Sequence, residues 1–362
     1  MSEFKPGLEG VVAFETEIAE PDRDGGALRY RGVDIEELVG VVPFERVWGL
    51  LVDGALSPGL PAAEPYESAS LTGHTPADLQ AVTARLGADW GLRQLIDSSD
   101  DEAREDLRRI SASMLSIAAR SARLADGNAM PVDRAVVERG ETAAGRFLLE
   151  WRGEADPRHV VALDTYWVCT AEHGLNASTF TARIVASTGA DCAAALSSAV
   201  GALSGPLHGG APARVLPMLD AAAAADSIEE YVAGLLDRGE RLMGFGHRVY
   251  RAEDPRARLL RRTAKELGSP RYEVADELER AALAELHARR PDRVLATNVE
   301  FWSAVVLDVA EIPPALAPAM FACSRTAGWS AHILEQKGLG RLVRPSARYV
   351  GPGPRPLAAV PA

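Results

Sequence analysis

The chain has 362 residues, of which 47% are hydrophobic, 25% are charged and 6% are aromatic. This composition excludes disordered and collagen-like proteins. A net charge of −12 disfavours nucleic acid or an anionic membrane as the main partner, so an anionic ligand has to meet a local cationic pocket. The N-terminal residues lack the apolar core of a secretory signal, and no stretch is long and apolar enough to span a membrane. We therefore expect a cytoplasmic protein.

The length exceeds the size at which single hydrophobic cores usually stop growing, so we expect two domains or a large domain with a smaller inserted one. No linker stands out in the sequence, which favours an insertion. Three cysteines, Cys169, Cys192 and Cys323, are widely spaced and form no CxxC pair. They are typical of buried thiols and not of a disulfide framework or a zinc site.

The N-terminal part predicts a short hairpin. Residues 11–18 and 27–31 have the composition of strands, and Asp24, Gly25 and Gly26 between them are typical of a turn.

Helices follow for most of the chain. Each predicted helix begins at a capping residue or continues an apolar stripe with spacings of three and four residues. The signals are Asp34 with Glu37, a stripe over 107–124 that ends at Gly127, Ser227 with Glu230, Asp254 with Pro255, and a stripe over 274–286. The fold class is therefore mainly α, and the proline-rich tail 351–362 is expected to be extended.

Three of the seven histidines, His173, His208 and His247, lie in glycine-containing turns. For one such histidine alone, a capping or packed imidazole is as good an interpretation as a functional one, but three together favour function. Their spacings of 35 and 39 residues argue against a three-histidine zinc site. The other four are His74, His159, His287 and His332, for which we expect a solvated or hydrogen-bonded structural role.

A helix is expected to begin near Pro212, and its positive end would favour a neutral imidazole at His208. A neutral ring can donate a hydrogen bond to a developing oxyanion. The turn at Asp254 would bring Arg256 toward His247, which suits a carboxylate ligand. A solvated helix residue is the alternative for Arg256.

Glu300 is the only acid in an apolar stretch, where burial would make it a stronger base. An acid satisfied by Asn298 or by a backbone amide is an equal interpretation. Arg325 and Arg344 also stand in mixed apolar settings, and a buried arginine favours a bidentate anion. The sequence contains no GxGxxG, Walker A, HExxH or GxSxG motif, so it offers no anchor for the corresponding classes of enzyme.

Taken together, these motifs resemble the citrate synthase family, and the resemblance extends from about Gly7 to Arg348. The matching pieces are 7–10 (GLEG), 28–38 (LRYRGVDIEEL), 172–180 (EHGLNASTF), 204–210 (SGPLHGG), 244–256 (GFGHRVYRAEDPR), 298–301 (NVEF) and 324–325 (SR). The short N-terminus resembles the compact homodimeric branch.

The resemblance implies an all-α homodimer with a large domain (1–210 and 316–362) and a smaller inserted domain (211–315). It implies condensation of acetyl-CoA with oxaloacetate, with coenzyme A as co-substrate and with no permanently bound cofactor or metal. His208 and Glu300 resemble the pair that enolises acetyl-CoA, and His247 resembles the histidine on the ketone oxygen. The implied oxaloacetate ligands are His173, Asn176, Arg256, Arg325 and, from the other subunit, Arg344; the implied coenzyme A ligands are Leu242, Met243, Gly244, Phe245, Gly246 and Arg251.

One departure concerns the base. The family usually has Asp at the position of Glu300, and the extra methylene can cost about 100-fold in rate unless something compensates. Trp302 and Ala304 also replace the more usual Tyr and Gly, so we expect a backbone shift over 301–304 to compensate. Two alternatives stay open: 2-methylcitrate synthase, since one methylene in a pocket changes discrimination by only about 1 to 3 kcal/mol, and a non-catalytic acyl-CoA or citrate sensor. A helical scaffold would leave the turn histidines unexplained.

Overall fold

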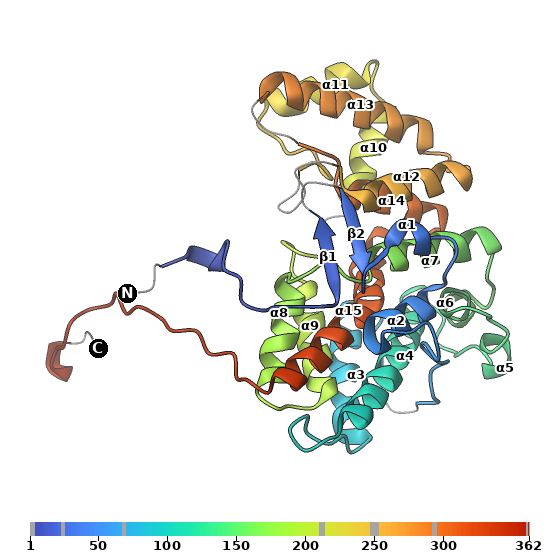
Figure 1. The fold of residues 1–362 in the computed structure, drawn as a ribbon. Helices are drawn as coiled ribbons and strands as arrows, with labels where there is room; N and C mark the ends of the chain where they lie inside the picture. Colours follow the sequence, from blue (N-terminus) through green and yellow to red (C-terminus); the bar gives the residue numbers. More distant parts are fainter. Residues whose placement is uncertain are drawn as a thin grey trace.

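The computed structural model of the chain describes residues 4–22, 26–66, 70–209, 214–246, 253–291, 295–359 and 361. Helices make up most of the regular structure of these residues, as the sequence predicts, and the strands form one small sheet (Figure 1). The three cysteines are free and buried, which confirms their interpretation as packed thiols. No helix among the described residues is long and apolar enough to cross a membrane.

The sheet has the antiparallel order β1 (Ala19–Asp22), β2 (Ala27–Tyr30), β3 (Val33–Asp34). The prediction of a strand over 11–18 is wrong. The ladder ends where Ala19 faces Tyr30, because the chain turns there through Arg31 and Gly32, which have positive φ. Beyond this pair the carbonyl of Ile18 accepts from the N–H of Arg31 at 2.9 Å, and the ladder does not continue to the preceding residues. The described residues of the predicted turn begin at Gly26; Asp24 and Gly25 lie outside them.

The larger group of helices contains the N-terminal part of the chain and the last long helix. These helices are α1 (Ile35–Leu38), α2 (Phe44–Asp53), α3 (Thr75–Asp89), α4 (Asp100–Ala125), α5 (Arg134–Val137), α6 (Ala143–Arg152), α7 (Pro157–Thr170), α8 (Ala177–Ser187), α9 (Cys192–Leu203) and α15 (Ala317–Leu339). Helix α15 packs against α2, α4, α7, α8 and α9 (Figure 1). Its side chains are buried almost along its whole length, so it is the central helix of this core.

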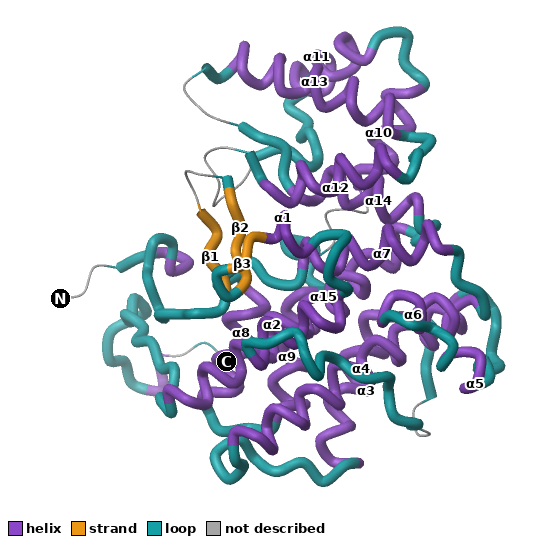
Figure 2. The backbone as a smooth tube through the Cα atoms, turned by 45° about the vertical axis from the view of Figure 1, so that its right-hand side comes forward, coloured by secondary structure: helices purple, strands orange, loops and turns teal. Residues whose placement is uncertain are grey.

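The remaining helices lie together at one end of the molecule (Figure 1). They are α10 (Val215–Ala223), α11 (Ile228–Asp237), α12 (Pro255–Glu266), α13 (Tyr272–Arg289) and α14 (Val299–Val309). Helices α12 and α14 also pack on α7, and β2 contacts α12, so the sheet lies where the two groups meet (Figure 2). The division into domains at 210/211 and 315/316 stays a prediction.

The helix starts follow the capping signals of the sequence. Ser227 accepts a hydrogen bond from the backbone N–H of Glu230 at 3.1 Å at the start of α11, and Asp254 caps α12, whose first residue is Pro255. The helix predicted near Pro212 begins at Val215 in the described residues, and Pro212 itself lies outside them. These predicted helices are therefore confirmed.

Both chain ends lead away from the helical body (Figure 1). Val12 is 86% exposed, and the residues after α15 are almost all exposed. The predicted extended tail is confirmed except for a single 3-10 turn over Leu357–Ala359. The Arg348 guanidinium lies 5.1 Å from the ring centre of Phe4, so the two ends contact each other.

Candidate active site

His208 lies in the tight turn that follows α9. The N–H of Gly209 donates to the carbonyl of Leu203 at 2.9 Å, and a Cβ on Gly209 would lie only 2.6 Å from that oxygen. Glycine is therefore required beside the histidine, because a side chain there would force the turn open. Burial, with the nearby charge of Arg325, lowers the pKa of His208 to about 4. This pKa gives the neutral imidazole that the sequence predicts, but the cause is burial and the charge of Arg325, and not the helix end expected near Pro212.

The His208 ring is held by a short hydrogen-bonded chain. Its Nε2 lies 2.9 Å from the hydroxyl of Ser178, which also lies 2.8 Å from Oδ1 of Asn176. Nε1 of Trp329 donates to the same hydroxyl at 3.2 Å, and Phe321 packs edge-on against the imidazole. Asn176, predicted as a substrate ligand, uses its side-chain oxygen to cap α8.

Arg256 is 2% exposed and forms a two-pronged ion pair with Asp254. Its Nε and Nη2 donate to the two carboxylate oxygens at 2.9 and 2.8 Å. The same carboxylate accepts from the backbone N–H of Val299 at 3.0 Å. Asp254 therefore joins the start of α12 to the start of α14, where Glu300 lies.

Glu300 is the second residue of α14, and Asn298 caps this helix by accepting from the Glu300 N–H at 2.9 Å. Asn298 thus satisfies the backbone of Glu300 and not its carboxylate. Burial raises the pKa of Glu300; Arg256 opposes this rise and Asp254 adds to it. The side chain is therefore a stronger base than an ordinary glutamate.

Residues 242–246, the predicted coenzyme A ligands, are tied to this same helix start. The N–H of Gly246 donates to the carbonyl of Ala296 at 2.8 Å, and the N–H of Asn298 donates to the carbonyl of Gly244 at 2.9 Å. Gly244 has a φ of +85°, and a Cβ on it would lie 2.5 Å from Cβ of Phe301. Only glycine allows this loop to lie so close to α14.

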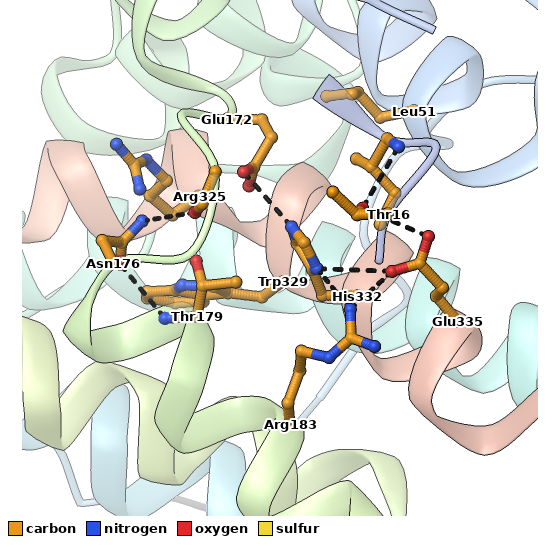
Figure 3. A network of polar contacts seen from close by, with 12 residues as sticks. Thr16, Leu51, Glu172, Asn176, Thr179, Arg183, Arg325, Trp329, His332 and Glu335 are labelled. Atoms are coloured by element: carbon orange, nitrogen blue, oxygen red, sulfur yellow. Dashed lines mark hydrogen bonds and ion pairs between the residues drawn. The ribbon is translucent and has the colours of Figure 1, made fainter. Parts of the chain in front are cut away.

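Arg325 is buried in α15 (Figure 3). Its Nε donates to the carbonyl of Thr170 at 2.6 Å. Within the described part of the chain, its Nη1 has no hydrogen-bond partner. Burial lowers the pKa of Arg325, and Glu172 opposes this effect most strongly. A buried guanidinium with an unused donor suits an incoming carboxylate.

The structure brings part of the predicted site together. The charge of Arg325 lowers the pKa of His208. The charge of Arg256 lowers the pKa of both Arg325 and Glu300. His173 is half-buried in the loop between α7 and α8, one residue after Glu172. Arg344 is exposed on the extended segment after α15. His247 and Arg251 lie outside the described residues, so their predicted roles stay predictions.

Sequence analysis missed three residues of this region: Ser178, Glu172 and the ion-pair role of Asp254. The last could have been found, because a capping carboxylate two residues before an arginine in α12 can reach its guanidinium. Ser178 meets His208, 30 residues further along the chain, and Glu172 meets His332 of α15, 160 residues further along, so neither contact is visible in the local sequence. In the described ranges, no three His, Cys, Asp or Glu side chains gather as they would around a metal ion.

Comparison with known proteins gives a consistent result. The sequence family described as "Citrate synthase, C-terminal domain" matches residues 7–346. The chain belongs to the citrate synthase family. It is 62% identical to "Putative citrate synthase 2" of Mycobacterium tuberculosis over 97% of this chain and 94% of that protein. It is 37% identical to the citrate synthase of Haloferax volcanii over 96% of each chain.

Solved citrate synthases also share the fold. The enzyme of Thermoplasma acidophilum, in a ternary complex with carboxymethyl coenzyme A and oxaloacetate, matches with a TM-score of 0.81 and 26% identity over 99% of this chain and all of that one. The citrate synthase of Pyrobaculum aerophilum matches with a TM-score of 0.80 and 30% identity over 98% and 94%. The resemblance and the all-α fold class predicted from the sequence are confirmed. Citrate synthases are acyltransferases that convert the acyl group into an alkyl group on transfer, so this chain is an enzyme of that class.

The buried ion pair between Asp254 and Arg256 predicts a large effect on stability. Replacing Asp254 with Ala should destabilise the protein by about 3–5 kcal/mol, because the buried guanidinium of Arg256 would lose the carboxylate with which it forms a two-pronged ion pair. Urea unfolding measures this free energy. Glu253→Ala is the matched control: it removes an exposed ion pair with Arg258 and should cost no more than about 1 kcal/mol. Equal stability of the two variants would contradict this account.

Proposed function

We propose that the protein is a citrate synthase that condenses acetyl-CoA with oxaloacetate and hydrolyses the resulting citryl-CoA to citrate and coenzyme A. The observation that supports this most is the combination of a buried carboxylate of raised pKa, Glu300, with an imidazole of lowered pKa, His208. Two buried arginines, Arg256 and Arg325, lie within electrostatic reach of this pair. Such a set can abstract a proton beside a thioester and stabilise the enolate that results.

Oxaloacetate is proposed to bind to Arg325 and Arg256 through its carboxylates. The unused Nη1 of Arg325 supplies a donor, and Arg256 is fixed in place by Asp254. His173 and Asn176 complete the proposed ligands from this chain. Residues 242–246 and Arg251 are proposed to hold coenzyme A, which acts as a co-substrate and not as a resident cofactor.

Enolisation requires both halves of the catalytic pair. Glu300 takes a proton from the methyl group of acetyl-CoA, and His208 donates a hydrogen bond to the thioester oxygen as negative charge develops there. This requires the ring hydrogen on Nδ1. In the structure the hydroxyl of Ser178 donates to Oδ1 of Asn176 and accepts from the indole N–H of Trp329. The required tautomer forms when that hydroxyl turns its hydrogen to Nε2 of His208, since Oδ1 of Asn176 keeps two backbone N–H donors.

The enol carbon then attacks the ketone of oxaloacetate, and His247 is proposed to polarise the ketone oxygen. The new carbon–carbon bond gives citryl-CoA. Water attacks the thioester carbonyl of that intermediate, and the thiol of coenzyme A leaves with a proton. Holding the two substrates in one geometry lowers the entropic cost of the condensation.

The pKa values predict an acid limb set by Glu300. His208 is neutral above its pKa of about 4. Glu300 must be deprotonated to act as a base, and burial raises its pKa above the usual value for a glutamate. Activity should therefore rise with pH through the pKa of Glu300 and not through that of His208. The dependence of kcat/KM for acetyl-CoA on pH measures this. Full activity at pH values where an ordinary glutamate is half-protonated would contradict it.

Release of coenzyme A thiol, followed with a thiol reagent, tests the proposed function. We expect release with oxaloacetate and acetyl-CoA, and a kcat/KM for propionyl-CoA that is lower by about 10-fold or more, which corresponds to one methylene in a pocket. A preference for propionyl-CoA would identify a 2-methylcitrate synthase instead. Tight binding of both ligands without thiol release would identify a sensor.

We propose a homodimer in which Arg344 reaches the active site of the other subunit. The exposed N-terminal and C-terminal segments, which extend from the body and contact each other through Arg348 and Phe4, support this arrangement. Mixing Arg344→Ala with Glu300→Gln subunits tests it. Mixed dimers should recover activity, because one of their two sites combines an intact Glu300 with an intact Arg344 from the other subunit. A monomer in sedimentation analysis, or no recovery in a proven mixed dimer, would contradict the proposal. A cytoplasmic location remains an expectation.

A further inference from the structure

A buried row of polar side chains runs from the loop before α8 through α15 to the N-terminal segment (Figure 3). Oε1 of Glu172 lies 3.2 Å from Nε2 of His332. Nδ1 of that histidine lies 2.9 Å from Nη1 of Arg183, which also pairs with Glu335. Glu172, His332 and Arg183 are each no more than 1% exposed. A buried row of this kind is costly to build unless its members are paired.

The neighbours of His332 fix its tautomer. The guanidinium of Arg183 can only donate, so Nδ1 of the ring must accept from it. The ring hydrogen is then on Nε2, and it is donated to the carboxylate of Glu172. His332 therefore connects a fixed cation to a fixed anion through a neutral ring.

Gly328 of α15 leaves the space that the carboxylate of Glu172 occupies. A Cβ on Gly328 would lie 2.0 Å from Oε2 of Glu172 and 2.7 Å from the carbonyl of Ala171. The backbone of Glu172 is held as well, because its N–H donates to the hydroxyl of Tyr30 at 3.3 Å. The carboxylate of Glu172 therefore packs directly against α15, the helix that contains Arg325.

Glu172 lies close to the arginine proposed to bind substrate. Its carboxylate packs on Gly328, one turn of α15 after Arg325, and Nε of Arg325 donates to the carbonyl of Thr170, two residues before Glu172. Among the charges around Arg325, that of Glu172 has the largest effect on its pKa and favours the charged guanidinium against burial. The described residues offer no hydrogen-bond partner for Oε2 of Glu172 or for Nη1 of Arg325. The position of the Glu172 carboxylate therefore depends on its single hydrogen bond from His332.

The far end of the row is fixed by the N-terminal segment. Oε1 of Glu335 accepts from the hydroxyl of Thr16 at 3.1 Å and from the N–H of Glu17 at 3.0 Å. The Arg183 guanidinium also lies over the ring of Phe14 at 4.1 Å. The segment before the sheet thus holds the arginine that orients His332.

We propose that His332 is a positioning residue for oxaloacetate binding. It holds the Glu172 carboxylate where its negative charge orients the buried guanidinium of Arg325 for the substrate carboxylate. His332 itself does not touch substrate. This inference rests on the proposed function, in which Arg325 binds oxaloacetate.

His332→Leu should raise the KM for oxaloacetate by about 10–100-fold, the effect of losing one hydrogen bond to a buried charge. The KM for acetyl-CoA should stay within about 3-fold, and kcat should change less than the oxaloacetate KM. His332→Gln keeps an N–H donor on the side chain and should recover most of the loss. His287→Leu and His287→Gln, at an exposed position of α13, are the matched controls and should behave as wild type.

Calorimetry with oxaloacetate alone separates this inference from the proposed function. Wild-type protein that binds oxaloacetate but releases no thiol would overturn the proposed function and leave the positioning role standing if His332→Leu binds more weakly. Unchanged oxaloacetate affinity in a folded His332→Leu protein would overturn the positioning role alone, as would failure of His332→Gln to improve on it. If circular dichroism shows that His332→Leu is unfolded, Glu172→Gln replaces it as the test variant. Gln keeps the shape of the side chain but removes its charge, so this variant should weaken oxaloacetate binding by a similar factor.

Discussion

Replacing Glu300 with Gln is expected to lower kcat by about 10²–10⁴-fold, the usual contribution of a general base. Gln keeps the size of the side chain but cannot accept the proton. The backbone should keep its conformation, because Asn298 caps the N–H of residue 300 and not its carboxylate. The KM for oxaloacetate should change little, since Arg256 keeps its ion pair with Asp254. Steady-state kinetics of thiol release measure both constants.

Asp at position 300 gives the sharper comparison. If the surrounding structure is adapted to the longer side chain, Glu300→Asp should be slower than wild type by up to about 100-fold, because the carboxylate is withdrawn by one bond length. Helix α14 is regular from Val299 onward, and Phe301 packs closely against Gly244. The backbone at position 300 therefore has little freedom to move and compensate for the shorter side chain of Asp. Activity that appears only in Glu300→Asp would show that the wild-type carboxylate is misplaced.

The second large effect concerns His208. Replacing it with Ala should lower kcat by about 10²–10³-fold, the usual loss on removing one donor from an oxyanion site. Gly209 and the turn bonds would be retained, so the loss should not come from unfolding. The double variant with Glu300→Gln should lose little more than the worse single variant, because each group is ineffective without the other.

Ser178→Ala provides a control for the orientation of that ring. It removes the hydroxyl at 2.9 Å from Nε2 while keeping the imidazole. We expect an intermediate loss in kcat, since the ring is present but its tautomer is no longer imposed. Strictly additive effects of His208→Ala and Ser178→Ala would contradict the view that Ser178 acts through the ring.

The sequence predicts the helices well where caps and apolar stripes are local. The starts at Ser227 and Asp254 depend on side chains two or three residues from the groups they cap, and such contacts are visible in the sequence. The strand over 11–18 was predicted wrongly because its composition suits a strand, whereas pairing depends on what lies opposite, and β2 reaches only as far as Ala19.

The same holds for the site: residues in a distinctive local sequence could be predicted, and contacts between distant residues could not. The glycines beside His208 indicate a turn, and Glu300 stands out as an acid in an apolar stretch. The sequence could therefore indicate both residues as candidates. His332 carries no such mark: it lies in a helix among small and apolar residues, and its link to Glu172 spans 160 positions. Long-range polar contacts of this kind form only when α15 packs against α7 and α8.

Exchange of the acetyl-CoA methyl protons with D2O tests the central claim most directly. Malate has the two carboxylates of oxaloacetate but no ketone to attack, so we expect it to fill the proposed oxaloacetate site, and exchange seen by NMR in its presence would report enolisation alone. We predict exchange by the wild-type protein that falls at least about 100-fold in Glu300→Gln and in His208→Ala. Exchange that persists at the wild-type rate in either variant would contradict the account.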